Sequence, residues 1–429
     1  MPEQRKPRFF KWFYPGMGIK RWISVCTSGL FLIVLVAVYT IRSFSKNNVL
    51  LAAFSTALVI FGVFLIYTGI QNMLRIFVKT LMPERKEELV DLVYQKRQER
   101  FLERGPRVVA IGGGTGLSTL LQGLKKYTKN ITAIVTVTDT GGSSGRLRDE
   151  LDILPPGDIR NCLVALADAE PLMLQLFQYR FENGSGLKGH SFGNLFITAL
   201  SKVTGDFDKA IKESSKVLAI RGHVIPSTLE KVSLVGEFFD GAVLKGETNI
   251  TGRGMPIKRV WLEPENCHAT PESLDAIENA DVIICGPGSL FTSVLPNLLI
   301  SEILQKILSS EAKKFYVANV MTQPGETDGF SVFDHLESLI RHTDPRLVDT
   351  VFVNTDPVPE NLLTKYQSQN ASQVRIDIEK IRERGYEVVE GSMVKFGEQV
   401  RHDPELLAKL MFEKLLEMNA QKDRVTVER

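Results

Sequence analysis

The sequence has 429 residues, 44% of them hydrophobic and 24% charged, which is typical of a globular protein and long enough for two or three structural units. Its formal net charge of +2 gives no argument for binding nucleic acid, and we expect no nucleic-acid partner. The cysteines and histidines are scattered without a C-x-x-C or H-E-x-x-H spacing, which excludes the common thioredoxin and zinc motifs.

Two long uncharged segments near the N-terminus predict a membrane hairpin. Residues 22–41 and 49–70 contain no charged side chain, and about 20 apolar residues of helix span the hydrocarbon core of a bilayer. The first segment is too long for the apolar part of a signal peptide. Neither segment has the polar face that a helix on the surface of a soluble protein carries.

Basic residues on either side of the hairpin predict its orientation. The short turn, residues 42–48, makes the two helices antiparallel and contributes only Arg42 and Lys46. The outer flanks are more basic: Arg5, Lys6, Arg8, Lys11, Lys20 and Arg21 precede the hairpin, and Arg75, Lys79, Arg85 and Lys86 follow it. The positive-inside rule then places both ends in the cytoplasm. We therefore expect a multi-pass protein of the cytoplasmic (inner) membrane, with its N-terminus and soluble domain in the cytoplasm.

Three segments follow from these patterns. Residues 1–78 hold the basic N-terminus and the membrane hairpin. Residues 79–104 are dense in both signs of charge, which predicts a solvated helical stalk. Gly105 and Pro106 then interrupt the chain before the soluble domain, residues 105–429.

Short apolar runs alternate with helical segments through the soluble domain, which predicts a Rossmann-like α/β fold. We expect strands at residues 107–111, 131–137, 281–285 and 314–320, and helices at 117–127 and 406–418. Such alternation forms a mostly parallel sheet with helices on both faces. Residues 232–259 instead predict an inserted β-meander. Ligands of α/β sheets bind at the carboxyl ends of the strands, so the loops there are the candidate site.

The first candidate loop lies between the first strand and its helix and consists of Gly112, Gly113, Gly114, Thr115 and Gly116. Glycine lets the backbone approach a phosphate closely, and the N-terminus of the following helix adds a partial positive charge. The loop is not a Walker motif, because Leu117 and Ser118 stand where a lysine is required. Its glycine spacing also departs from G-x-G-x-x-G, and a tight turn without a ligand is the alternative.

Two further loops follow predicted strands. Asp139 ends the second strand and opens a loop rich in glycine and hydroxyl groups, which suits phosphates or a metal ion held by Asp139, unless the loop is merely solvated. Gly286, Gly288 and Ser289 directly follow the strand at 281–285, again ahead of a helix. Two strand–glycine–helix loops in one sheet fit a diphosphate better than a single phosphate.

Four polar residues beside apolar runs are further candidates. Asn194 and Asn319 carry amide groups that suit the edge of a nucleobase or a sugar. His190 stands alone, and such a histidine is more often structural than catalytic. Asp158 follows the rigid turn at 155–157 and is expected to cap the next helix.

Together these motifs resemble one family. The chain reads VVAIGGGTGLSTLLQGLK, TVTDTGGSSGRLR, PPGDIRN, GHSFGNL, CGPGSLFTSVLPNLL and MTQPGET in this order. These segments are similar to those of the YvcK-type gluconeogenesis factors, in the wider CofD-like family named for 2-phospho-L-lactate transferase. The resemblance runs from about residue 107 to about residue 410 and does not include the membrane hairpin.

The resemblance implies a Rossmann-like fold that binds a nucleotide-sugar such as UDP-N-acetylglucosamine, with no cofactor required and no established catalytic activity. It also implies a role in gluconeogenic growth, cell shape and cell-wall precursor supply. By position, it assigns nucleotide binding to the first glycine loop, Asp139, Asn194, Gly286, Gly288, Ser289 and Asn319, and sugar-nucleotide binding to Tyr366 and Arg401. The transferase branch has an Asp-Asp element where this chain has Thr138, Asp139 and Thr140, which weakens the case for phospholactyl transfer.

Three functions remain as hypotheses. The first is a regulator that senses a nucleotide-sugar and acts on a protein partner in cell-envelope metabolism, with homo-oligomerisation left open. The second is a transferase of the 2-phospho-L-lactate type, in which Asp139 would hold Mg²⁺. The third, a nicotinamide oxidoreductase, is disfavoured by the glycine spacing, and a fold alone does not define a function.

Overall fold

The computed structural model describes residues 19–42, 49–81, 97, 100–184, 186–397 and 399–427. The chain divides into two compact units, Met1–Glu99 and Arg100–Arg429. The predicted stalk lies mostly outside the described residues, as does the turn at 43–48. The soluble domain predicted from residue 105 begins five residues earlier, because a short helical segment at 100–103 belongs to the second unit.

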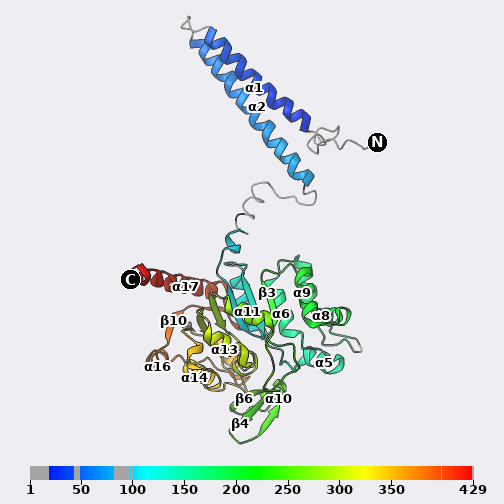
Figure 1. Cartoon of the computed structure of the whole chain (residues 1–429), viewed down its shortest axis with the longest axis vertical. Coiled ribbons are helices and arrows are strands. Elements are labelled where there is room, and N and C mark those ends of the chain that lie inside the picture. The colour runs from blue at the N-terminus through cyan, green and yellow to red at the C-terminus, as the bar shows by residue number, and fades with distance from the viewer. Residues whose placement is uncertain are drawn as a thin grey trace. The chain divides into compact units, whose positions relative to one another are not determined.

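Two long helices, α1 (Ile19–Arg42) and α2 (Val49–Leu81), form the described part of the first unit (Figure 1). Both predicted spans lie inside these helices. Residues 21–40 and 53–76 are long and apolar enough to cross a membrane, by length and composition. The two spans therefore have the helical structure that the sequence predicts.

Small residues let α1 and α2 pack closely. Ser55, Gly62 and Gly69 recur every seven residues on α2 and are buried against α1. A Cβ atom added at Gly62 would lie 2.7 Å from Cγ1 of Ile33 and 3.0 Å from the carbonyl oxygen of Gly29. Close backbone approach through small residues is the usual way in which apolar helices associate where no hydrophobic effect acts between them.

In the described part of the second unit, seven parallel strands form one sheet in the order β10-β9-β8-β7-β1-β2-β3. Their bounds are β1 Val108–Gly112, β2 Ile131–Val135, β3 His223–Pro226, β7 Val282–Cys285, β8 Lys313–Val317, β9 Thr350–Asn354 and β10 Glu387–Gly391. The order reverses at β1, which pairs with β2 on one side and β7 on the other. This is the doubly wound topology, so the predicted fold class is confirmed.

Helices cover the two faces because the crossovers run in opposite directions from β1. On one face α4 (Gly114–Leu124) packs against α6 (Gly157–Leu166), and on the other α11 (Pro271–Glu278) packs against α13 (Ser301–Ser309). The remaining helices are α5 Gly142–Leu151, α7 Pro171–Gln178, α8 Phe192–Thr204, α9 Phe207–Val217, α12 Leu295–Leu298, α14 Val332–His342, α15 Glu360–Gln367, α16 Ile378–Glu383 and α17 Pro404–Val427.

The helix α4 shows why the sequence forms this layer. Leu117, Leu120, Leu121 and Leu124 recur at helical spacing and are fully buried. The helix begins at Gly114, three residues before the predicted start, because the glycine loop itself forms the first turn. Near its other end, a Cβ atom on Gly123 would lie 2.6 Å from the carbonyl carbon of Pro404, the first residue of α17. The start of α17 therefore rests directly on the backbone of α4.

Two smaller sheets complete the unit. The predicted meander forms a three-stranded antiparallel sheet of β4 (Ser233–Phe238), β5 (Val243–Lys245) and β6 (Ile257–Glu263), with β4 in the centre. An unexpected helix, α10 (Glu247–Gly252), lies between β5 and β6. A second antiparallel pair, β11 (Val394–Phe396) and β12 (Val400–His402), leads directly into α17.

Candidate functional site

A pocket of about 460 Å³ lies where the strands β1, β7 and β8 end. Its residues come from segments that are far apart in the sequence: Gly113, Gly114, Thr115, Gly116, Glu247, Gly288, Ser289, Ser293, Asn319, Gln323, Glu326, Tyr366, Arg401 and His402 are among them. A position beside the strand where the order reverses is the expected place for a ligand in a doubly wound sheet. Most of the residues predicted from the sequence are therefore brought together here.

The first glycine loop presents the N-terminus of α4 to the pocket. Gly114 has a φ of +62°, a left-handed conformation that side chains with a Cβ atom rarely adopt. The next amides, those of Thr115 and Gly116, lie in the first turn, where N–H groups have no carbonyl partner within the helix. These amides and the helix dipole make this end of α4 a suitable site for an anion.

The first glycine loop (residues 112–116) lies against the loop that follows β7 (residues 286–289), which is called the second loop below. A Cβ atom on Gly116 would lie 2.7 Å from the carbonyl carbon of Pro287 and 2.9 Å from Cα of Gly288. Only glycine allows this approach, because the facing atoms are backbone. The loops therefore form one continuous wall of the pocket.

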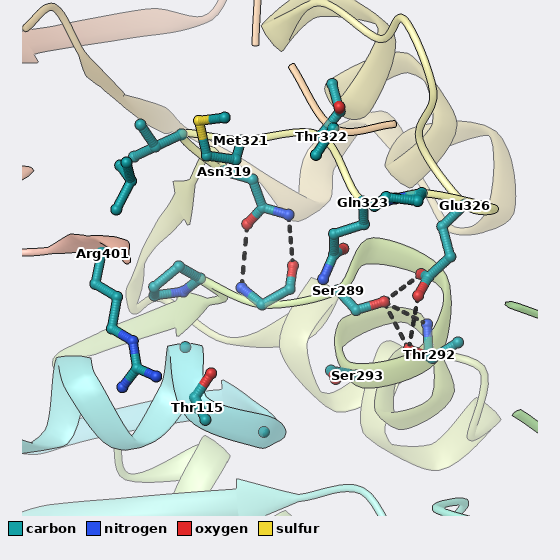
Figure 2. Close-up of a pocket in the computed structure, with 18 of the residues that line it drawn as sticks. Thr115, Ser289, Thr292, Ser293, Asn319, Met321, Thr322, Gln323, Glu326 and Arg401 are labelled. Carbon is teal, nitrogen blue, oxygen red and sulfur yellow. Dashed lines mark hydrogen bonds between the residues drawn. The ribbon is translucent and has the colours of Figure 1, made fainter. Parts of the chain in front are cut away.

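Asn319 joins the end of β8 to the second loop. Its Oδ1 accepts a hydrogen bond from the Gly288 amide (3.2 Å), and its Nδ2 donates to the Gly288 carbonyl (2.8 Å), as Figure 2 shows. Asn319 lines the pocket as predicted, but this amide is held by the loop. We conclude that Asn319 shapes the second loop.

Glu326 occupies the N-terminus of the π-helical turn Leu290–Val294 (Figure 2). Its carboxylate accepts hydrogen bonds from the hydroxyl groups of Ser289 and Thr292 and from the Phe291 amide. The side chain is 6% exposed, and burial raises its pKa to about 7 despite these donors. The Ser289 hydroxyl group, which was expected to face a phosphate, therefore donates to the buried carboxyl group of Glu326.

The donors that remain free define where an anion would sit. The Gly114 amide donates to the carboxylate of Asp158, and the Gly288 amide donates to Asn319. What faces the pocket is the first turn of α4, at Thr115 and Gly116, with the hydroxyl groups of Thr115 and Ser293 close by (Figure 2). The free donors are thus centred on α4 and are not shared equally between the two loops.

Three carboxyl groups meet beside this anion site. Burial, and then the charge of Asp139, raise the pKa of Asp158 to about 6 and that of Glu247 to about 8. Glu247 also shares a hydrogen bond with Asp139. Among the residues that the structure describes, no three His, Cys, Asp or Glu side chains are arranged to hold a metal ion.

Four predicted residues do not line the pocket. Gly112 and Gly286 lie behind the two loops, at the ends of β1 and β7. Asp139 does not line the pocket itself but shares a hydrogen bond with Glu247, which does. Asn194 is buried on α8, where its Nδ2 donates to the hydroxyl group of Ser143 (3.1 Å).

The structure also shows where His190 and Asp158 lie. His190 is buried and its Nδ1 lies 2.9 Å from the same Ser143 hydroxyl group, which fits the structural role expected for it. The prediction that Asp158 caps a helix was wrong, because Pro156 holds the N-cap position of α6 and Asp158 lies in the first turn. Asp158 instead faces the first loop, where a Cβ atom on Gly113 would lie 2.5 Å from Oδ2.

The far end of the pocket is formed by α15 and β12. The hydroxyl group of Tyr366 accepts a hydrogen bond from the Val400 amide (2.9 Å), which fixes the position of the ring. Arg401 and His402 follow on β12, and all of these line the pocket. Tyr366 and Arg401 therefore lie in the same pocket as the first glycine loop, although they follow it by 250 residues or more along the chain.

Sequence reasoning did not single out several residues of the site, among them Glu247 and His402. Glu247 carried no signal, because it lies in the inserted segment and reaches the pocket only through α10. His402 directly follows the predicted Arg401, and the structure shows that it is buried and lines the pocket. A buried histidine and a partly buried carboxyl group become recognisable only once the fold has placed them.

The chain is similar to proteins of one family. Residues 108–394 match the family described as 2-phospho-L-lactate transferase CofD. The gluconeogenesis factor of Bacillus subtilis is 49% identical over 313 residues, which cover 73% of this chain and 99% of that protein. The crystal structure of a UPF0052-family protein from Bacillus halodurans superposes with a TM-score of 0.69 at 48% identity, covering 71% of this chain and 98% of that one.

One relative extends over the N-terminal helices. A Clostridium acetobutylicum protein, provisionally described as a gluconeogenesis factor, is 43% identical over 430 residues, which cover 97% of this chain and 94% of its own. The Bacillus subtilis protein, by contrast, is covered almost end to end while about a quarter of this chain stays outside the match.

Proposed function

This chain belongs to the CofD family as one of its gluconeogenesis factors, and from that premise we propose that it is a membrane-anchored regulator that binds a nucleotide-sugar of the UDP-N-acetylglucosamine type. The anchor would be the hairpin of α1 and α2. The ligand site would be the pocket at the ends of β1, β7 and β8. The regulated process would be gluconeogenic growth, with cell shape and cell-wall precursor supply.

The observation that carries the proposal is the free first turn of α4 inside a long pocket. The amides of Thr115 and Gly116 and the hydroxyl group of Ser293 offer donors to a diphosphate. The pocket volume of about 460 Å³ suits a ligand of nucleotide size. The pocket continues past this turn in both directions, which leaves room for a group on each side of the diphosphate.

A binding measurement on the full chain in lipid nanodiscs tests this function. We expect saturable one-to-one binding of UDP-N-acetylglucosamine by calorimetry, weakened by Gly114→Val, because a β-branched residue is strained at a φ of +62°. A Cβ atom there has room, with its nearest neighbour at 3.7 Å, so the fold should survive. Absence of binding to every nucleotide-sugar tried would reject the proposal.

The transferase remains the alternative, because the matching family is described by that activity. Under this alternative, Asp139 would hold Mg²⁺ against the diphosphate. Asp139→Asn should then abolish product formation from a nucleotide diphosphate and a phosphorylated acceptor while leaving binding intact. For the regulator we expect no Mg²⁺-dependent turnover by the parent chain, and binding within about threefold of the parent for Asp139→Asn, since this side chain does not line the pocket.

The pocket's carboxyl groups predict that affinity falls as the pH rises. A nucleotide-sugar keeps its two negative charges from pH 6 to 9, whereas Asp158, Glu326 and Glu247 ionise near pH 6, 7 and 8. Each new charge at a distance of roughly 8 Å should cost about 1–2 kcal/mol of binding, or about tenfold in affinity. The guanidinium group of Arg401, at one end of the pocket, offsets only part of this repulsion.

Titrations at several pH values check this dependence. Glu247→Gln removes the ionisation near pH 8 and should flatten the upper part of the profile while leaving the part near pH 7. An affinity that is constant, or that rises with pH, would show that these carboxyl groups do not face the bound diphosphate.

Membrane attachment and partners are separate parts of the proposal. The whole chain should fractionate with the cytoplasmic membrane and stay there after an alkaline carbonate wash, whereas residues 100–429 alone should be soluble. The ligand would act by changing the affinity of the soluble domain for a protein of cell-envelope metabolism.

A further inference from the structure

The two ends of the pocket differ in chemistry. One end is formed by Tyr366, Val400 and Met321, which belong to a small hydrophobic cluster, together with Arg401 and His402. The opposite end carries Glu247, Glu326, Gln323 and Thr322. Figure 2 shows Arg401 on one side of Thr115 and Glu326 on the other. The first end suits an aromatic base, and the second suits sugar hydroxyl groups.

His402 places an unused acceptor at the apolar end. Its side chain is 9% exposed, and the ring forms a hydrogen bond with the carbonyl group of Ala318. Its Nε2 is buried and has no partner. Since a carbonyl group only accepts, the bonded nitrogen must be Nδ1 carrying the proton, which leaves Nε2 as an acceptor.

The protonation state of His402 does not change in the physiological range. Burial lowers its pKa to about 4, so the ring is neutral at pH 6–8. No acidic residue lines this end of the pocket in the described part of the chain. Nε2 therefore stays an acceptor, and a buried acceptor without a partner is costly unless a ligand or water donates to it.

We infer that His402 is a specificity-determining residue, whose Nε2 accepts a hydrogen bond from a ring N–H of the nucleobase, with the sugar lying toward Gln323. The inference rests on the proposed nucleotide-sugar function and adds the ligand's direction in the pocket. A uracil ring can supply this donor, because its N3 carries a hydrogen atom on the edge of the ring between the two carbonyl groups. At the opposite end of the pocket, Gln323 offers a second acceptor for a sugar hydroxyl group, since its Oε1 is also buried without a hydrogen-bond partner.

A base analogue tests the inference on the full chain in nanodiscs. N3-methyl-UDP differs from UDP only by a methyl group in place of the N3 hydrogen. We expect the parent chain to bind the analogue about ten- to a hundredfold more weakly, because the donor is lost and Nε2 stays unpaired. His402→Leu should bind both nucleotides with similar affinity, and His402→Gln, which keeps an acceptor, should retain most of the difference.

Gln323→Leu is the matched control at the other end. It should reduce the preference for UDP-N-acetylglucosamine over UDP and leave the discrimination against N3-methyl-UDP unchanged. A structural role for His402 would lower both affinities together without changing their ratio, and so would overturn the inference. Equal binding of UDP and its analogue by the parent chain would also overturn it while leaving the nucleotide function standing. No binding of either nucleotide would count against the function itself.

Discussion

Gly116→Ala is expected to reduce nucleotide-sugar affinity by at least about a hundredfold, the largest effect of any single methyl group in the site. The added Cβ atom would lie 2.7 Å from the carbonyl carbon of Pro287 and 2.9 Å from Cα of Gly288. Backbone atoms cannot rotate away as a flexible side chain does, so the two loops must separate. Separation moves the first turn of α4 away from Ser293, and the diphosphate loses its converging donors. Calorimetric titration with UDP-N-acetylglucosamine measures the loss.

A second glycine gives the control for this substitution. Gly252 ends α10, and a Cβ atom there meets no atom within 4 Å. Gly252→Ala should leave affinity unchanged and stability equal or slightly higher, because alanine favours a helix. Gly116→Ala should cost about 1–3 kcal/mol of folding stability through overpacking, so the variant remains folded. Parent-like affinity in a folded Gly116→Ala protein would mean that the contact between the loops does not matter for binding.

Glu326→Ala is expected to destabilise the second unit by about 2–4 kcal/mol, since it leaves the Ser289 hydroxyl group and the Phe291 amide without their acceptor, whereas the Thr292 hydroxyl group still donates to Ser289. In a unit of this size that loss lowers the melting temperature by roughly 5–12 °C. Glu326→Gln keeps one acceptor oxygen and the shape of the side chain, and should lose less than half as much. Thermal unfolding of the three proteins at pH 6 measures both effects.

The same residue gives stability a dependence on pH. The pKa of Glu326 is raised to about 7 in the folded chain, against about 4.3 for an unfolded glutamate. The folded state therefore holds the proton more tightly, and this contribution to stability is complete below about pH 4.3 and is lost as the pH rises through 7. Glu326→Gln should flatten the profile in that window. Asp158 and Glu247 act in the same direction and are present in both proteins. The charge of Glu326 also helps to raise the pKa of Glu247, so the difference between the proteins reports Glu326 together with its effect on Glu247.

The loops that line the pocket could be predicted where their position depends on local backbone geometry. The glycine runs at 112–116 and 286–288 follow β1 and β7, and strands that are neighbours in a sheet bring their following loops together. That adjacency follows from the doubly wound order, which the alternation of strands and helices predicted. Glycine also marks the contact between the loops, since no other residue permits it at Gly116.

The hydrogen-bond partners of the polar side chains in these loops could not be predicted in the same way. Ser289 follows a predicted strand and was expected to face a phosphate, yet its hydroxyl group donates to Glu326, more than 30 residues later. Glu247 reaches the pocket from an inserted sheet through a helix of six residues. Both results depend on contacts between distant segments, whose partners leave no period or spacing in the sequence. Asn194 shows the reverse error, because a polar residue beside an apolar run became part of a buried network behind the site.

The contact between α4 and the start of α17 links the two ends of the pocket through a single helix. The N-terminal turn of α4 lines the pocket at Thr115 and Gly116, and Gly123, near its other end, lies against Pro404, two residues after His402. The spacing between these two walls is therefore set by the length of one rigid helix. A substitution that shifts α4 along its axis would displace both walls together and keep their separation.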